Sequence, residues 1–168
     1  MSASELQVRV RPMTLMDIDD VLSLDQILRE SDVSLTYTGF SPIRQTFGMN
    51  VEKDSSSKRP NLSEVTSLIE LSLLAESEGT LVGFIVGRQK YLAEYDIQAG
   101  EIAMIGVNRD YRGKGVGTKL INALDDLFRS RGVQSVRVGI DPLDKDLLAF
   151  FEKEGFSGER ILYYSKTL

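Results

Sequence analysis

The 168-residue sequence contains no cysteine and no histidine. Without cysteine there is no disulfide, no thiolate nucleophile and no cysteine-ligated metal. Without histidine there is no serine–histidine triad, no imidazole base and no histidine-ligated metal, so we expect no metal site. Any proton transfer must therefore use carboxylates, tyrosine, lysine or water.

The sequence also lacks a long apolar run and an excess of positive charge. No stretch approaches the roughly 20 apolar residues that a membrane helix needs, and the N-terminus does not resemble a signal peptide. We therefore expect a cytoplasmic protein without a membrane partner. The net charge of −5 argues against nucleic-acid binding. The length and the ordinary hydrophobic content are typical of one globular domain, residues 1–168.

The first part of the chain predicts a strand followed by a helix. Residues 8–11 alternate in polarity and precede a proline. Thr14 and Asp17 have the spacing of a capping box, and apolar residues recur at helical spacing over about 15–30. We expect the acidic residues of this helix to face solvent: Asp17, Asp19, Asp20 and Asp25.

Residues 31–67 have no clear pattern. A short helix could be lined by Phe40, Ile43, Phe47 and Met49, and a polar loop follows over 54–60. A loop of this length in a compact domain is usually functional or mobile. A substrate-side flap and a disordered insertion both remain open.

The second half of the chain alternates between strand-like and helix-like segments. A turn at Glu78–Gly79 joins the first two strands into a hairpin, and a polar connection near 93–100 leads to the next strand. The connection from that strand to the following one contains a helix, so this pair should be parallel. The predicted elements are strands over 68–75 and 80–88, a strand from Glu101, a helix from 116 to 131, a strand over 136–140, a helix capped by Asp144 and ending at Glu154, and a closing strand over 160–166.

A glycine-rich turn links the strand that begins at Glu101 to the following helix. Such a turn lets backbone N–H groups approach an anion, and the helix N-terminus adds partial positive charge, so we predict a phosphate site. The Walker A motif fails because its second glycine would fall on Thr118. The Rossmann motif fails because its third glycine would fall on Thr118 or Leu120. A nucleotide-binding module is therefore disfavoured.

A third pattern, Arg-x-x-Gly-x-Gly, fits Arg112, Gly115 and Gly117, and a second motif, Phe-Phe-Glu-Lys-Glu-Gly-Phe, lies downstream at 150–156. In this order the two motifs resemble the GNAT superfamily of acyl-CoA-dependent N-acetyltransferases. Segments 8–28 and 79–84 are similar to the family's opening strand and helix and to its central hairpin. The resemblance implies an α/β (α+β) fold with a mixed, mostly antiparallel sheet of roughly six or seven strands and about four helices. A splayed parallel strand pair would form the acyl-CoA cleft.

The resemblance also implies acetyl-CoA as cosubstrate. The main chain of Ile105 and Val107, with Gly106 between them, would bind the pantetheine arm, and Phe151 would pack on the cofactor. Two cations in the turn could add full positive charge near the phosphates. The pyrophosphate would bind to the turn and the start of its helix: Arg112, Gly113, Lys114, Gly115, Val116, Gly117 and Thr118.

Glu101 is the candidate general base. It opens the central strand, where several family members use a glutamate to remove the proton of the amine, and burial in an apolar cleft strengthens a carboxylate as a base. The other interpretation is a surface residue at the end of a strand. Because the chain has no cysteine, a route through an acyl-cysteine is excluded, and direct attack in a ternary complex remains.

The general acid is less clear because Phe151 stands where many family members have tyrosine. Phenylalanine cannot donate a proton. The alternatives are water or one of four tyrosines, among which Tyr164 is the candidate: Tyr91, Tyr95, Tyr163 and Tyr164. A second departure is Asp144, at a position where the family often has an asparagine that touches the cofactor. An acid is unfavourable near an anion, so we expect Asp144 to act as a helix cap.

We therefore expect an N-acetyltransferase that acts on a primary amine, either a small molecule or a peptide or protein. The acceptor stays open, as does the assembly state, with a homodimer among the options. The alternative is a non-catalytic acyl-CoA-binding or regulatory domain with the same fold, which the missing tyrosine at position 151 favours.

Overall fold

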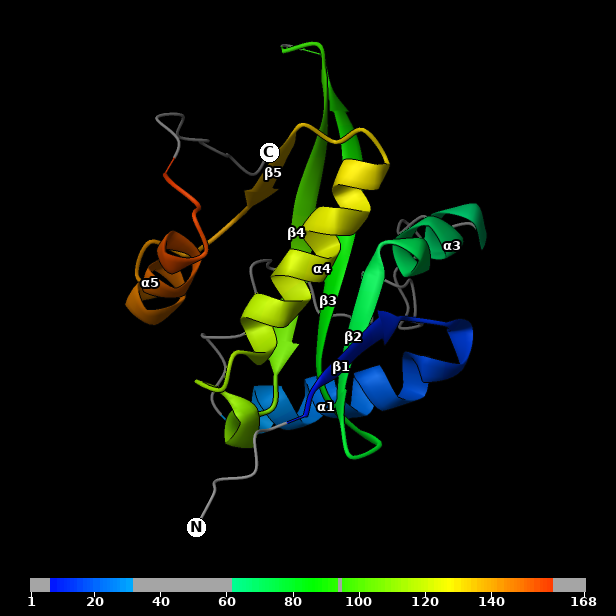
Figure 1. Cartoon of the computed structure of the whole chain (residues 1–168), viewed down its shortest axis with the longest axis vertical. Coiled ribbons are helices and arrows are strands. Elements are labelled where there is room, and N and C mark those ends of the chain that lie inside the picture. The colour runs from blue at the N-terminus through cyan, green and yellow to red at the C-terminus, as the bar shows by residue number, and fades with distance from the viewer. Residues whose placement is uncertain (1–6, 32–61, 94, 159–168) are drawn as a thin grey trace, which may run out of the picture.

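The computed structural model describes residues 7–31, 62–93 and 95–158, and these residues form one twisted sheet with helices on both faces (Figure 1). The strands lie in sequence order, antiparallel except for the parallel last pair. Their bounds are β1 Arg9–Pro12, β2 Ser72–Ser77, β3 Thr80–Leu92, β4 Ile97–Val107 and β5 Ser135–Val138.

Two buried clusters divide the core between the faces of the sheet. On one face α4 (Val116–Ser130) packs its apolar stripe, including Leu120, Leu124 and Phe128, against β2, β3 and β4. α1 (Ile18–Ser31) and α3 (Leu62–Glu70) cover the other face. α5 (Lys145–Lys153) follows β5 and contributes Leu147 and Phe151 to the core on the α4 side. Two short 3₁₀ turns complete the description: η1 Leu15–Asp17 and η2 Arg109–Tyr111.

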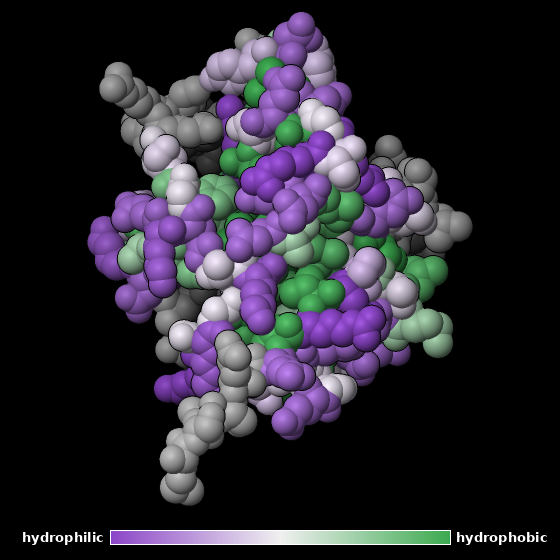
Figure 2. Space-filling model, viewed as in Figure 1, coloured by the Kyte–Doolittle hydropathy of each residue, from purple (hydrophilic) through white to green (hydrophobic). Residues whose placement is uncertain are grey.

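The outer surface of α4 is hydrophilic, while hydrophobic surface shows beside it over the neighbouring strands (Figure 2). This agrees with the sequence, in which the apolar residues of the helix recur on one stripe and its charged residues lie elsewhere. Within the described ranges, no helix is both long and apolar enough to cross a bilayer.

A β-bulge at Ala103 marks the centre of β4. Met104 lies opposite Val86 and Ile102 lies opposite Gly87, so Ala103 is an extra residue on β4. The bulge comes directly after Ile102, the last residue of β4 that pairs with β5. Because a bulge bends its strand and strengthens the local twist, it helps to turn β4 away from β5 at this point.

The predicted mixed sheet with a parallel pair is confirmed, although the described residues hold five strands rather than six or seven. The parallel relation of β4 and β5, the turn at Glu78–Gly79 and the Asp144 cap of α5 are also confirmed. The closing strand predicted over 160–166, and the helix predicted around Phe40, lie outside the described residues.

Four boundaries were predicted wrongly. β3 ends at Leu92 and not at Arg88. Leu68 to Glu70 end helix α3 and do not begin a strand, because a short apolar run fits either element. β4 begins at Ile97, within the segment expected to be a connection, and the outer part of the β3–β4 hairpin extends past the core (Figure 1). β5 ends at Val138, so Ile140 lies beyond it.

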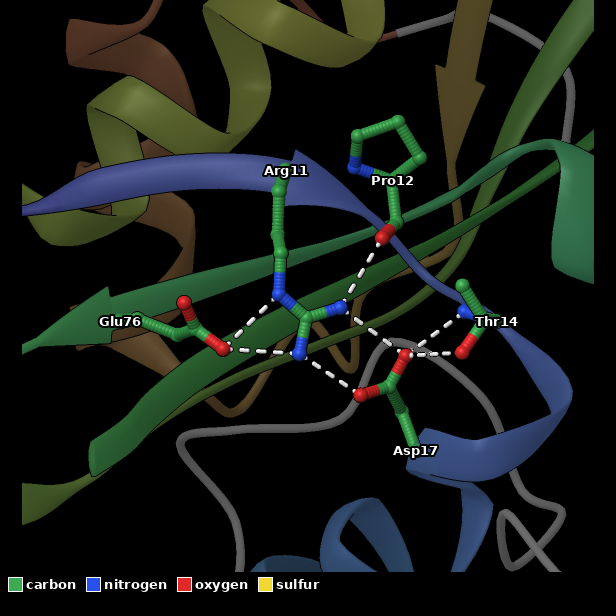
Figure 3. A network of polar contacts seen from close by, with 5 residues as sticks. All are labelled: Arg11, Pro12, Thr14, Asp17 and Glu76. Carbon is green, nitrogen blue, oxygen red and sulfur yellow. Dashed lines mark hydrogen bonds and ion pairs between the residues drawn. The ribbon is translucent and has the colours of Figure 1, made fainter. Parts of the chain in front are cut away.

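The acidic residues of the first helical segment were also predicted wrongly in part. Asp17 and Asp25 are buried rather than solvated. The Asp17 carboxylate accepts two hydrogen bonds from the Arg11 guanidinium, at 2.6 and 2.9 Å, and two from the backbone N–H and hydroxyl of Thr14 (Figure 3). Arg11 also donates to Glu76 on β2, so this network ties η1 to the edge of the sheet. The pairing with Arg11, followed by the bonds from Thr14, holds the pKa of Asp17 well below its usual range.

We expect Asp17→Asn to lower the free energy of unfolding by about 2 kcal/mol at pH 7, since hydrogen bonds to a charged partner are lost. A lowered pKa in the folded state stabilises the protein above the unfolded pKa of about 3.9, and this contribution is lost as the pH falls from about 4 through the folded pKa. The difference between the wild type and the variant should therefore shrink by about 1 kcal/mol at pH 3. Urea unfolding at both pH values measures it.

Asp19→Asn is the matched control, because Asp19 lies in the first turn of α1 and is exposed. It should change stability by less than about 0.5 kcal/mol at either pH. An equal loss for Asp17→Asn at pH 7 and pH 3 would contradict the assignment to the ionised pair.

Candidate active site

The central feature of the site is a gap in the sheet between β4 and β5. The two strands pair only from Ala99–Ser135 to Ile102–Val138. β4 nevertheless continues to Val107 and stays paired with β3. From Met104 to Val107, β4 therefore has no parallel partner among the described residues. Peptide groups on such an open strand edge are available to a ligand that lies alongside it.

A pocket of about 400 Å³ opens at the far end of this gap, which is within the usual size range of small-molecule sites. It lies between the end of β4, the turn before α4 and the inner side of α5; we call it the α4–α5 pocket. Ile105 and Val107 line it, whereas the Gly106 position faces Phe84 and Leu28 on the opposite side of the sheet. The residues of α5 and its C-cap that line the pocket are Asp146, Leu147, Phe150, Lys153 and the C-cap residue Glu154.

The turn from Arg112 to Gly115 needs its glycines for backbone reasons. Gly113 and Gly115 have φ values of 69° and 79°, which residues with a side chain rarely adopt. Gly115 is the N-cap residue of α4, and no side chain in the described residues caps the helix there. The first N–H groups of α4 are thus left for a ligand, in the partial positive field of the helix end.

Gly117 serves a different purpose, which is space. A Cβ atom at this position would lie 2.9 Å from Cζ of Phe150 on α5. The missing side chain lets α4 and α5 approach each other beside the pocket.

Arg112 points back toward β4. Its Nε donates to the Val107 carbonyl at 3.1 Å, and its Nη2 is buried without a hydrogen-bond partner among the described residues. A buried, unsatisfied guanidinium N–H is costly unless an acceptor reaches it. Lys114, in contrast, is exposed, with its ammonium 5.6 Å from the centre of the Tyr111 ring.

Thr118, in the first turn of α4, has a partner that was not predicted from the sequence. Its hydroxyl donates to Oε1 of Glu154 on α5 at 2.6 Å. A carboxylate therefore lies at the helix N-terminus, inside the α4–α5 pocket.

Glu101 lies at the closed end of the gap, on a second pocket. This β4–β5 pocket, of about 630 Å³, is lined by Lys90, Arg137 and Phe151 among others. The Gly100 position faces Phe128 of α4, so Glu101 points to the opposite face of the sheet. There its carboxylate forms an ion pair with Lys90, and its neighbours across the strands are Arg88 and Arg137.

The predicted environment of Glu101 is therefore wrong in one respect. The carboxylate is about one-third exposed and lies among cations, not deep in an apolar cleft. Glu101 also does not open the strand as predicted, because β4 begins at Ile97; it lies next to Ile102, the last residue of β4 that pairs with β5.

Comparison with known proteins decides the family. The profile of the "Acetyltransferase (GNAT) family" matches residues 43–156, which is more than half of the chain. The chain belongs to this family.

Individual GNAT relatives are distant. An N-alpha-acetyltransferase 30 from Schizosaccharomyces pombe is 29% identical over 94 residues, which cover 56% of this chain and 62% of that protein. The match thus spans less than two thirds of the relative's length. Among solved structures, an aminoglycoside N-acetyltransferase in complex with CoA has a TM-score of 0.68 at 16% identity, with full coverage of both chains. A ribosomal-protein-alanine N-acetyltransferase from Brucella melitensis has a TM-score of 0.64 at 19% identity, covering 96% of this chain and 100% of that one. These two structures share the GNAT fold with this chain.

Within this GNAT fold, most of the predicted cofactor residues come together. The predicted residues that line the α4–α5 pocket are Ile105, Val107, Arg112, Gly113, Gly115, Val116, Gly117 and Thr118. Lys114, which was also predicted, does not line it. Phe151 does not line it either: it is 1% exposed, stacks edge-on against Phe150 and Phe156, and reaches only the β4–β5 pocket. Its neighbour Phe150 faces the α4–α5 pocket, as does Tyr111, and neither was predicted from the sequence.

The structure describes two of the four tyrosines that were predicted as candidate general acids. Tyr163 and Tyr164 lie outside the described residues. Tyr91 and Tyr95 are 57% and 47% exposed on the outer β3–β4 hairpin. The hydrogen bond from Tyr91 to Asp96 raises the pKa of its hydroxyl, which makes it a poorer proton donor. Tyr95 lies against the Arg137 guanidinium, 5.4 Å from the ring centre.

Proposed function

We propose that this GNAT chain transfers an acetyl group from acetyl-CoA to a primary amine. The observation that carries the proposal is the gap between β4 and β5, which leads from Glu101 at its closed end to an uncapped helix N-terminus at its open end. The candidate base and the candidate phosphate site thus lie at the two ends of this gap.

The residues of the open end fit a nucleotide-linked thioester. The buried Nη2 of Arg112 lacks an acceptor among the described residues, and a phosphate oxygen would supply one. The N–H groups of Val116, Gly117 and Thr118 would bind phosphate at the start of α4. When bound, acetyl-CoA supplies the acetyl group as a thioester.

The unpaired part of β4 would hold the pantetheine arm through its main chain at Ile105 and Val107. The Val107 carbonyl already accepts from Arg112, and its second lone pair remains for a ligand donor. Because main-chain groups do the binding, the side chains of Ile105 and Val107 are free to pack in the core beneath α4.

Glu101 would take the proton from the acceptor amine. Its carboxylate pairs with the Lys90 ammonium, which supports a role for this position in binding a primary ammonium group. A protonated acceptor could replace Lys90 there, and Glu101 could then accept its proton before the amine attacks directly.

The proton for the leaving thiolate has no placed donor among the tyrosines that were predicted as general acids and that the structure describes. Phe151 cannot donate, and Tyr91 and Tyr95 lie on the exposed hairpin. Water stays a candidate source of this proton, and Tyr164 stays a prediction.

The names of two structural neighbours refer to an aminoglycoside and to a ribosomal protein alanine. They support an amine as the acceptor without assigning its kind. We propose a small-molecule amine or a peptide or protein amine as the partner, in the cytoplasm, without nucleic acid or membrane. The single domain over 1–168 and a homodimer stay predictions.

The test is a product screen with the full chain. Acetyl-CoA is incubated with polyamines, aminoglycosides, and peptides that carry a free N-terminus or a lysine, and mass spectrometry identifies the acetylated product. At least one class should yield an amide together with free CoA. Tight acetyl-CoA binding by calorimetry without turnover on any amine would instead favour a non-catalytic, acyl-CoA-binding domain.

A further inference from the structure

We propose that Glu154 lowers the affinity of this chain for acetyl-CoA by occupying the phosphate position at the start of α4. The inference rests on the proposed function, because it assigns a role to a residue beside the proposed pyrophosphate site. It concerns a carboxylate on α5, a helix that the phosphate-turn motif does not include.

Glu154 already takes the one hydrogen bond that the Thr118 hydroxyl can donate. The Thr118 hydroxyl donates to Glu154 Oε1 at 2.6 Å, and both residues line the α4–α5 pocket. A hydroxyl has a single O–H donor, so Thr118 cannot donate to Glu154 and to a phosphate at the same time. A phosphate that binds here must either displace Glu154 or do without Thr118.

The charge of Glu154 also opposes a phosphate in the α4–α5 pocket. The pocket is lined by the cations Arg112 and Lys153 but also by the acids Asp146 and Glu154, so the local charges balance. A carboxylate at a helix N-terminus is stabilised by the same partial positive charge that attracts a phosphate. The Glu154 carboxylate and a phosphate would therefore compete for the same partial positive charge, and they would repel each other.

The charge of Glu154 also affects Asp125 on α4. Burial raises the pKa of Asp125, and the negative charges of Asp126 and Glu154 raise it further, against the opposing effect of Arg129. Glu154 therefore acts on the inner face of α4 beyond its own hydrogen bond.

A purely structural role would be to tie α5 to α4, and the ligand distinguishes the two roles. Acetyl-pantetheine carries the thioester arm of acetyl-CoA without any phosphate. Removing the Glu154 charge should strengthen binding of acetyl-CoA and leave acetyl-pantetheine unchanged, whereas a change in the packing of α5 would affect both.

The experiment is calorimetry with the full chain. Glu154→Gln should lower the Kd for acetyl-CoA about tenfold, with a smaller gain at high salt because the repulsion is screened. Glu154→Ala should show the same gain, which excludes a new hydrogen bond from the glutamine amide. Glu70→Gln removes the same charge at an exposed site on α3, paired only with Arg131 in the described residues, and should leave the Kd within twofold.

Thr118→Val completes a double-mutant cycle. In the wild type the hydroxyl is held by Glu154, so its loss should change the Kd for acetyl-CoA less than twofold. In the Glu154→Ala background the hydroxyl is free for phosphate, and its loss should raise the Kd by about threefold or more.

The outcomes separate the two proposals. A wild-type chain that binds acetyl-CoA and a Glu154→Ala variant that binds it no more tightly would overturn this inference alone. Equal gains for acetyl-CoA and acetyl-pantetheine would also overturn it. A folded wild-type chain that binds no acetyl-CoA would overturn the proposed function and this inference with it. Thermal unfolding of each variant shows that the comparison is made between folded proteins.

Discussion

Gly117→Glu is expected to weaken acetyl-CoA binding by about 100-fold or more, because a like charge placed against an anionic ligand costs several kcal/mol. The new carboxylate would start at the second residue of α4, inside the α4–α5 pocket. The fold should survive. The Cβ atom meets only the far end of the Phe150 ring, which can move, and an acidic residue is favourable in the first turn of a helix. Calorimetry measures the affinity, and thermal unfolding checks the fold.

Two controls separate charge at the site from other effects. Gly117→Ala introduces the contact with Phe150 without charge and should cost far less affinity. Asn122→Glu adds the same charge on the exposed side of α4 and should leave the Kd nearly unchanged. If Gly117→Glu bound acetyl-CoA with wild-type affinity, the pyrophosphate would have to bind elsewhere and the proposed site would be wrong.

Glu101→Gln is expected to reduce turnover by about 100-fold or more, which is a typical contribution of a general base. Glutamine keeps the size of the side chain but cannot take a proton from the amine. The affinity for acetyl-CoA should not change, because Glu101 lies at the closed end of the gap and not in the α4–α5 pocket. Steady-state kinetics with the acceptor found in the product screen, together with calorimetry, measures both quantities.

Lys90→Gln separates the base from its ion pair. It removes the partner of Glu101 and keeps the carboxylate, so turnover should fall far less than in Glu101→Gln. Stability should change little in either variant, since exposed ion pairs contribute little. An equal loss in the two variants would mean that the pair, and not the carboxylate, supports turnover. Full activity of Glu101→Gln would exclude Glu101 as the base.

The most predictable part of the molecule is the run from β4 through the turn into α4. Its signals are local: an apolar strand, glycines at fixed spacing, a stripe that repeats every three or four residues and a glycine at the end of the helix. Each signal lies within one turn or one strand, so a sequence displays it directly. The separation of β4 from β5 was predicted from the family resemblance, because the spacing of apolar residues carries no information about it.

The contacts that shape the two ends of the site were not predictable in the same way. Thr118 and Glu154 lie on different helices, and Lys90 and Glu101 on different strands. Such pairs depend on the register of the hairpin and on how α5 packs against α4. Asp17 is a similar case. The spacing of Thr14 and Asp17 predicts the start of a helix, whereas the pairing of Asp17 with Arg11 depends on how η1 folds back on β1.

The edge of β4 that faces the gap has a consequence for the cohesion of the sheet. β3 accompanies β4 along nearly its whole length, whereas β5 leaves it after Ile102. A thioester arm lying along Met104 to Val107 would fill the place of the absent neighbour and bridge the two sides of the opening. The proposed cosubstrate would thus complete the sheet while it is bound, and the folded state would gain stability with it. Under the proposed function, each turnover removes one strand from this sheet and then replaces it.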